Sequence, residues 1–213
     1  LVIGAWVVLL VLALLPYTEN PAGPIKDIIT HWVVVVLGVV WLAAMMFRGE
    51  SLRLGTPTLG ILAAFLALNL LAALAGDHRA NSLDTWRVWV TLSLLTLWAA
   101  QAYRRPEQVW HLLAVIAVAV GLSSVYGFSQ LAGFDPFPWA GTDIEEYHGL
   151  PSTYANPNFA GHALVLAFLM ACGLAAAARS PFRWLYGGVA CLTGAHLLLT
   201  HMRGGPVALV AAG

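Results

Sequence analysis

Charged residues are scarce in this chain. Only 9% of its 213 residues are Asp, Glu, Lys or Arg, whereas 60% are hydrophobic. A soluble domain carries about 25% charged residues because its surface must face water, so the composition excludes a soluble globular fold. The formal net charge is zero, which leaves no basic surface for nucleic acid. We therefore expect the lipid bilayer as a partner, and no nucleic acid.

Cysteine and membrane-embedded carboxylates are also sparse. The chain has 2 cysteines, Cys172 and Cys191, and both fall in apolar runs, where a thiol usually packs like a small hydrophobic residue. No Asp or Glu stands in the middle of an apolar run. Proton- and cation-coupled transporters commonly place a carboxylate there, so its absence argues against that class.

Carboxylates gather instead in one polar segment. Asp143, Glu145 and Glu146 follow one another closely there, and such a group can bind a hard cation such as Mg²⁺ or Ca²⁺. A solvated acidic loop explains the same residues without a ligand. We favour the solvated loop and predict no metal site.

Long apolar runs dominate the rest of the chain, and a bilayer span needs about 20 such residues. Thr56-Pro57 and Asn156-Pro157 each resemble an N-cap followed by proline at the first helical position. We predict an all-α polytopic transmembrane helix bundle of about seven spans. Residues 1–213 are expected to be the N-terminal part of a single integral-membrane domain that continues beyond residue 213. The predicted spans are Leu1–Leu15, Ile28–Phe47, Pro57–Ala75, Leu83–Tyr103, Val109–Leu131, Pro157–Ala178 and Trp184–His201.

The basic residues predict the orientation of the spans. Alternate connections each hold a pair of arginines, whereas the connections between them hold most of the acids. Because cytoplasmic loops are enriched in Lys and Arg, we expect the arginine pairs on the cytoplasmic side of a bacterial inner membrane. The start of the chain is then cytoplasmic, and the loop Ala132–Ala155 is periplasmic. The pairs are Arg48 with Arg53, Arg104 with Arg105, and Arg179 with Arg183.

Polar residues gather where the last two predicted spans have their outer ends. These spans form one hairpin, so their outer ends should be neighbours. His196, Thr200 and Arg203 have the i, i+4, i+7 spacing of one helical face. Helix starts at Pro157 and Pro206 would point positive dipole ends outward, which with an arginine makes a natural anion site. The residues expected to bind substrate are Asn156, Asn158, His162, His196, His201 and Arg203.

Several of these residues also have simpler explanations. Asn156 is explained by an N-cap alone. A hydrogen bond to a carbonyl across helices explains His162 and His196 as well as substrate binding does. Arg203 could extend toward the membrane surface, but its place beside two glycines favours a functional role. Polar residues deep in the spans are expected to hydrogen-bond between helices; they are Asn69, Ser123 and Ser124.

Three stretches together resemble a known family. They are Val125–Gln130 (VYGFSQ), Ser152–Asn158 (STYANPN) and Thr200–Gly204 (THMRG). The O-antigen ligase family has a Tyr-Gly…Gln stretch before an external loop, a Gly-Thr-Phe-x-Asn-Pro-Asn type motif at a helix start, and a later Thr-x-Ser-Arg-Gly motif. Met202 stands where the serine is usual, but the arginine is in register. The resemblance covers mainly residues 125–213.

This resemblance implies a membrane glycosyltransferase of GT-C-like architecture that uses no metal or cofactor. Such ligases transfer O-antigen glycan from undecaprenyl pyrophosphate to lipid A–core on the periplasmic face, in lipopolysaccharide biosynthesis. Family arginines bind the pyrophosphate, which gives this role to Arg203, and the general base is expected beyond residue 213. An O-antigen polymerase and a protein O-oligosaccharyltransferase share these motifs and remain alternatives. A small-anion transporter is an alternative of another class.

Overall fold

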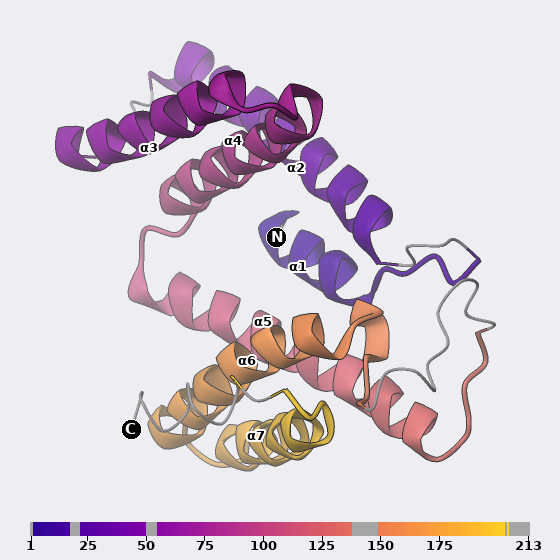
Figure 1. The fold of residues 1–213 in the computed structure, drawn as a ribbon. Coiled ribbons are helices and arrows are strands. Elements are labelled where there is room, and N and C mark those ends of the chain that lie inside the picture. Colours follow the sequence, from indigo (N-terminus) through magenta and orange to yellow (C-terminus); the bar gives the residue numbers. More distant parts are fainter. Residues whose placement is uncertain (1, 18–21, 50–54, 138–148, 203, 205–213) are drawn as a thin grey trace. The chain divides into compact units, whose positions relative to one another are not determined.

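The computed structural model describes residues 2–17, 22–49, 55–137, 149–202 and 204, and within them all regular structure is helical (Figure 1). In chain order the elements are α1 (Val2–Leu12), α2 (Gly23–Arg48), α3 (Thr56–Ala75), α4 (Arg79–Ala102), α5 (Pro106–Leu131), the 3-10 turn η2 (Ser152–Tyr154), α6 (Pro157–Ala177) and α7 (Phe182–Leu199).

Each α-helix overlaps one of the seven ranges predicted from hydropathy, although α2, α3, α4, α5 and α7 begin before the predicted residue. Asn156 is the N-cap of α6, with its side chain accepting from the backbone N–H of Asn158 and with proline following it, as predicted. The prediction for Thr56 was wrong by one residue. Helix α3 already begins at Thr56, and Gly55 occupies the N-cap position. A polar residue before proline therefore marked both helix starts, but only Asn156 acts as the cap.

Four of these helices are long and apolar enough to cross a membrane, so the protein is a multi-pass helical membrane protein. They span Gly23–Arg48, Pro57–Ala75, Pro106–Leu131 and Pro157–Ala177. Exposed apolar side chains such as Ile61 and Leu68, 73% and 66% exposed, suit contact with lipid. The 11 residues of α1 reach only about 16 Å. The predicted count of about seven spans is thus supported for four.

The chain forms two compact units. One, here called unit 1, comprises Leu1–Ile29 and Glu107–Gly213, and the other, unit 2, comprises Thr30–Pro106. The chain therefore leaves unit 1 near the start of α2 and returns to it at the start of α5. Each unit is described separately below.

Small side chains build the core of unit 1. Ala119, Ala160 and Ala167 are fully or almost fully buried with Leu164 and Leu197, and a second cluster of Ala117, Ala171, Leu174 and Ala190 continues the same packing. Small residues let helices approach closely, which matters in lipid because no hydrophobic effect drives helices together there. Helices α6 and α7 consequently form a closely packed hairpin, which brings the start of α6 beside the end of α7, as predicted.

Tryptophans contribute much of the packing in unit 2. Trp41 and Trp98 stack with ring centroids 4.9 Å apart, and the Trp86 indole donates to the Leu66 carbonyl over 2.9 Å, which joins α3 to α4. Asn69 was predicted to bond between helices, but its amide donates to Phe65 of its own helix. This carbonyl lies one turn away on α3, so the amide is satisfied without reaching α4.

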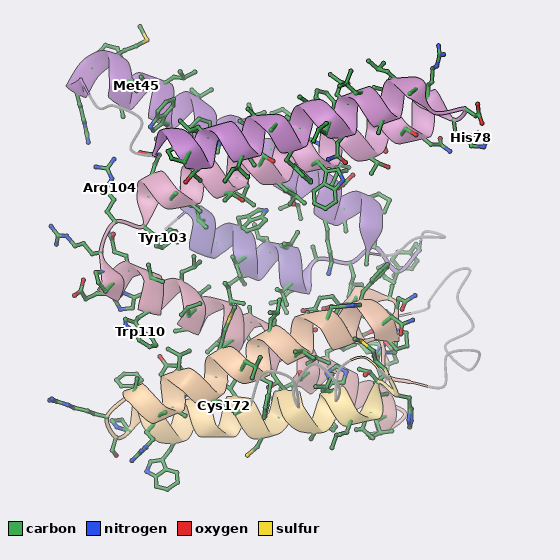
Figure 2. The ribbon with its side chains drawn as sticks, turned by 60° about the vertical axis from the view of Figure 1, so that its left-hand side comes forward. Met45, His78, Tyr103, Arg104, Trp110 and Cys172 are labelled. Carbon is green, nitrogen blue, oxygen red and sulfur yellow. The ribbon has the colours of Figure 1, made fainter. Side chains whose placement is uncertain are left out.

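The connections between the helices of unit 2 lie at its two opposite ends. Figure 2 shows Met45 and Arg104 toward one end and His78 at the opposite end. The arginine-rich connections after α2 and α4 thus share an end, which is the alternation that the predicted orientation requires. Which end faces the cytoplasm remains a prediction.

Cysteine labelling tests that orientation. Phe134 is 73% exposed in the predicted periplasmic loop, and Arg105 is exposed in a predicted cytoplasmic connection. Cys172 and Cys191 are both free and exposed, so both are first replaced by alanine. In that background, Phe134→Cys should react with a membrane-impermeant maleimide added from the periplasmic side. Arg105→Cys should react only after the inner membrane is permeabilised. The reverse pattern would invert the topology and remove the site from the periplasm.

Candidate functional site

The segment that leads into α6, residues 149–155 and here called the entry loop, lies at the centre of a buried polar network in unit 1. Ser152 and Thr153 are buried although both are polar. Two of the loop residues have left-handed backbone, Ser152 with φ 50° and Ala155 with φ 58°. Such conformations are uncommon for residues other than glycine and persist where the surroundings fix them.

Hydroxyl groups connect the entry loop to α5. The Ser123 hydroxyl lies 2.8 Å from that of Ser152 and 2.7 Å from that of Thr153, and Ser152 also donates to the Ser123 carbonyl. Thr153 in turn donates to the Val11 carbonyl over 2.6 Å, so it accepts from Ser123. The prediction that Ser123 bonds between segments is confirmed.

Lys26, the only lysine in the chain, joins the entry loop to α1. Its ammonium donates to the carbonyls of Thr153, over 3.0 Å, and Val11, over 3.4 Å. The last carbonyls of a helix have no partner within it and attract cations, so Lys26 and Thr153 together cap α1. Lys26 also stands 4.5 Å from the centre of the Tyr154 ring.

The Tyr154 phenol is enclosed near the same hydroxyls. Burial raises the pKa of Tyr154, and the neighbouring Ser123 hydroxyl offsets a part of that rise. The phenol oxygen is buried, and among the described residues no hydrogen bond of good geometry reaches it. Tyr154 therefore stays protonated at neutral pH and serves the site through its ring, which packs against the hydrophobic core.

Helix α7 is connected to the entry loop in a similar way. The Leu150 N–H donates to the Leu199 carbonyl in the last turn of α7 over 3.2 Å. His196 is fully buried, with Nε2 3.3 Å from the Leu150 carbonyl and Nδ1 3.0 Å from the Ser124 hydroxyl. Ser124 thus bonds between helices, as predicted, and His196 bonds a carbonyl across segments, which was one of its two interpretations.

Gln130 and Asp135 brace the other side of the loop. The Gln130 amide oxygen accepts from the Ser152 N–H over 3.1 Å, while its nitrogen donates to Asp135 over 2.8 Å. Tyr126 and the Phe137 N–H donate to the same carboxylate. Gln130, which entered the analysis only through the family motif, and Asp135 therefore have a structural role.

The first two turns of α6 carry two exposed polar residues. Asn158 and His162 are both exposed, and His162 Nδ1 lies 2.7 Å from the Asn158 carbonyl one turn earlier. His162 therefore bonds within its own helix, and its other nitrogen, Nε2, is on an exposed ring. Asn156, Asn158 and His162 lie together at one helix start, as predicted from their spacing.

The end of α7 differs from the prediction. The helix ends at Leu199, the Thr200 hydroxyl turns back to the Leu197 carbonyl, and His201 is exposed with φ 54°. The regular helix that carries His196 thus stops at Leu199, before Thr200, and the predicted shared face of His196, Thr200 and Arg203 stays a prediction. Arg203 itself lies outside the described residues.

Met202 nevertheless brings this end of the chain to the start of α6. Its side chain lies directly over Gly161, where an added Cβ would come within 3.1 Å of the Met202 Cβ. The Thr200 carbonyl carbon would lie 2.8 Å from a Cβ at Gly149. The first residue of the entry loop and Gly161 of α6 therefore pack against residues 200–202.

Asp143, Glu145 and Glu146 also lie outside the described residues, so the choice between a cation site and a solvated loop stays a prediction. Within the described ranges, no three His, Cys, Asp or Glu side chains form a group that could hold a metal ion.

Sequence reasoning missed Lys26, Ser152 and Thr153 as parts of the site. One signal was available for Lys26, because it is the sole lysine and stands on the acidic side of the predicted topology. The two hydroxyl residues gave no signal beyond the family motif that contains them.

Comparison with known proteins does not add a family assignment. No family model, curated protein or solved structure matches the chain.

Proposed function

We propose that the protein is a membrane glycosyltransferase of O-antigen ligase type with GT-C architecture. It transfers O-antigen glycan from undecaprenyl pyrophosphate to lipid A–core at the periplasmic face of a bacterial inner membrane. The start of the chain lies in the cytoplasm, and the reaction uses neither metal nor cofactor. Arg203 and the start of α6, with Asn156, Asn158 and His162, bind the pyrophosphate of the donor, and His201 stands beside them.

The observation that carries this proposal is the packing of Met202 over Gly161 in the first turn of α6. Met202 directly precedes Arg203 in the sequence, and the helix amino end that it reaches has Pro157 at its first position and no acidic residue in its first turn. A helix amino end and a guanidinium both favour anions, and the guanidinium can bind phosphate oxygens with two parallel hydrogen bonds.

The chemistry explains why an anion site would speed this reaction. The bond between the anomeric carbon and the pyrophosphate oxygen breaks, and a new bond forms to the acceptor hydroxyl oxygen, whose proton passes to the general base. Negative charge on the pyrophosphate grows as its bond breaks. Fixed positive charge beside it therefore stabilises the transition state more than the ground state, and only such differential binding accelerates the chemical step.

Complementation tests the proposed function. The complete protein, expressed in a strain that lacks its O-antigen ligase, should restore the lipopolysaccharide ladder and remove the accumulated lipid-linked glycan. Lipid-linked glycan that becomes longer without reaching lipid A–core would indicate a polymerase instead. Glycan transferred to protein would indicate a protein O-oligosaccharyltransferase. A protein present in the membrane with none of these effects would contradict glycan transfer.

A further inference from the structure

The entry loop is held at two points by residues from other elements. Near its end, the Thr153 carbonyl accepts from Lys26, and its hydroxyl meets Ser123. Near its beginning, Leu150 is held through both backbone groups, because its N–H donates to Leu199 and its carbonyl faces His196. Helix α6 starts directly after the loop, so whatever fixes the loop also fixes the helix start.

Hydrogen-bond chemistry determines what His196 does at Leu150. A carbonyl oxygen only accepts, so the nitrogen that faces it, Nε2, must carry a proton. Nδ1 faces the Ser124 hydroxyl, which can accept from a protonated nitrogen or donate to a neutral one. Both ring nitrogens are therefore occupied by protein partners in either protonation state.

The surroundings of His196 leave no room for a ligand at the ring. The side chain is 0% exposed, and a Cβ at Gly127 would lie 2.8 Å from both Cε1 and Nε2. Gly127 thus provides the space that the imidazole occupies between α5 and the loop. A buried ring with both nitrogens bonded cannot contact a substrate, although it can position the segment that does.

We propose that His196 is a positioning residue, which through the Leu150 carbonyl holds the entry loop and hence sets the start of α6 where the donor pyrophosphate binds. The inference rests on the proposed function for the identity of the donor. It replaces direct substrate contact, the role first expected for His196, with an action through the loop.

Two substitutions separate this role from simple packing. The amide of glutamine reaches about as far from the backbone as imidazole Nε2, so His196→Gln can still donate to Leu150. The amide of asparagine reaches only as far as Nδ1, so His196→Asn can bond Ser124 but loses Leu150. His111→Asn, at an exposed histidine near the start of α5, is the matched control.

Two measurements on the complete, detergent-purified protein test the proposal. In His196→Asn, peptides that contain the amides of Leu150, Ser152 and Tyr154 should exchange hydrogen about 3- to 10-fold faster than in the wild-type protein. The loss of one hydrogen bond predicts a change of this size. In an assay with undecaprenyl-pyrophosphate-linked O-antigen and lipid A–core, His196→Asn should raise the KM for the donor by a similar factor. The KM for the acceptor should not change. His196→Gln should restore most of both properties.

Each outcome has a distinct meaning. Wild-type exchange in His196→Asn would show that Leu150 is not held by His196 and overturn the proposal. Faster exchange with an unchanged donor KM, or a lower maximal rate alone, would leave His196 a packing residue and also overturn it. If the wild-type protein transferred no glycan, the proposed function and the positioning role would fall, and hydrogen exchange would still decide whether His196 holds the loop.

Discussion

Replacement of Arg203 by alanine is expected to abolish attachment of O-antigen to lipid A–core while the protein remains folded in the membrane. A charge-assisted hydrogen bond contributes about 1.5–3 kcal/mol, which corresponds to roughly 10- to 150-fold in rate. The variant should lose more binding free energy in the transition state than in the ground state, because the pyrophosphate gains negative charge as its bond breaks. The measurements are the lipopolysaccharide ladder and the accumulated lipid-linked glycan in a ligase-deficient strain that expresses the variant.

Two further variants show whether the guanidinium geometry matters. Arg203→Lys should rescue only in part, because an ammonium keeps the charge but not the two parallel donors of arginine. Arg179→Ala, at an exposed arginine in the connection between α6 and α7, should leave the ladder unchanged and is the matched control. A normal ladder with Arg203→Ala at normal expression would leave Arg203 an anchor at the membrane surface and remove it from the site.

The positions of the helices were predictable because each depends on a local run of sequence. Hydropathy placed all seven α-helices, and the main difference is at α2, which begins at Gly23 instead of Ile28. Its first five residues include Lys26 and Asp27, and a search for apolar residues excludes such a segment. In the structure the segment is helical because the Lys26 ammonium finds carbonyl partners in α1 and the entry loop.

The candidate site was predictable only in part, since its contacts join distant parts of the chain. Asn156 was found because an N-cap followed by proline is a local signal. Lys26 and Thr153 are 127 residues apart, and Thr153 and Val11 are 142 apart. No local pattern reports such pairs. The predicted span ran two residues past the end of α7, because the left-handed backbone of His201 is incompatible with the helix that hydropathy alone would continue.

The missed contacts share one physical cause. In lipid, a backbone carbonyl at a helix end finds no water and must be satisfied by the protein. The ends of α1 and α7 are satisfied by the entry loop, through Thr153 and Leu150. The entry loop thus donates hydrogen bonds to the end carbonyls of α1 and α7 and is then followed directly by α6. These bonds explain why polar residues are buried at this point of an apolar chain.

Gly149→Ala is expected to destabilise the protein. An added Cβ would lie 2.8 Å from the Thr200 carbonyl carbon and 3.2 Å from the Pro157 Cβ. Because the nearest atoms are backbone, a rotamer change cannot relieve the overlap, and the loop must move away from α7. Overpacking of this kind costs ~1–3 kcal/mol, which should lower the apparent Tm in detergent by roughly 2–12 °C.

Gly187→Ala is the matched control, because this glycine lies within α7 and a Cβ there would meet nothing within 4 Å. In a helix with open space around it, alanine should be neutral or gain ~0.5–1 kcal/mol over glycine. Movement of the loop in Gly149→Ala should also break the Leu150 hydrogen bond to Leu199, so exchange at the Leu150 amide should accelerate together with the fall in Tm. A Gly149→Ala protein with the Tm and the Leu150 exchange rate of Gly187→Ala would show that the loop does not pack on Thr200. The entry loop would then lose one of its contacts with the end of α7, whereas the packing of Met202 over Gly161 would be unaffected.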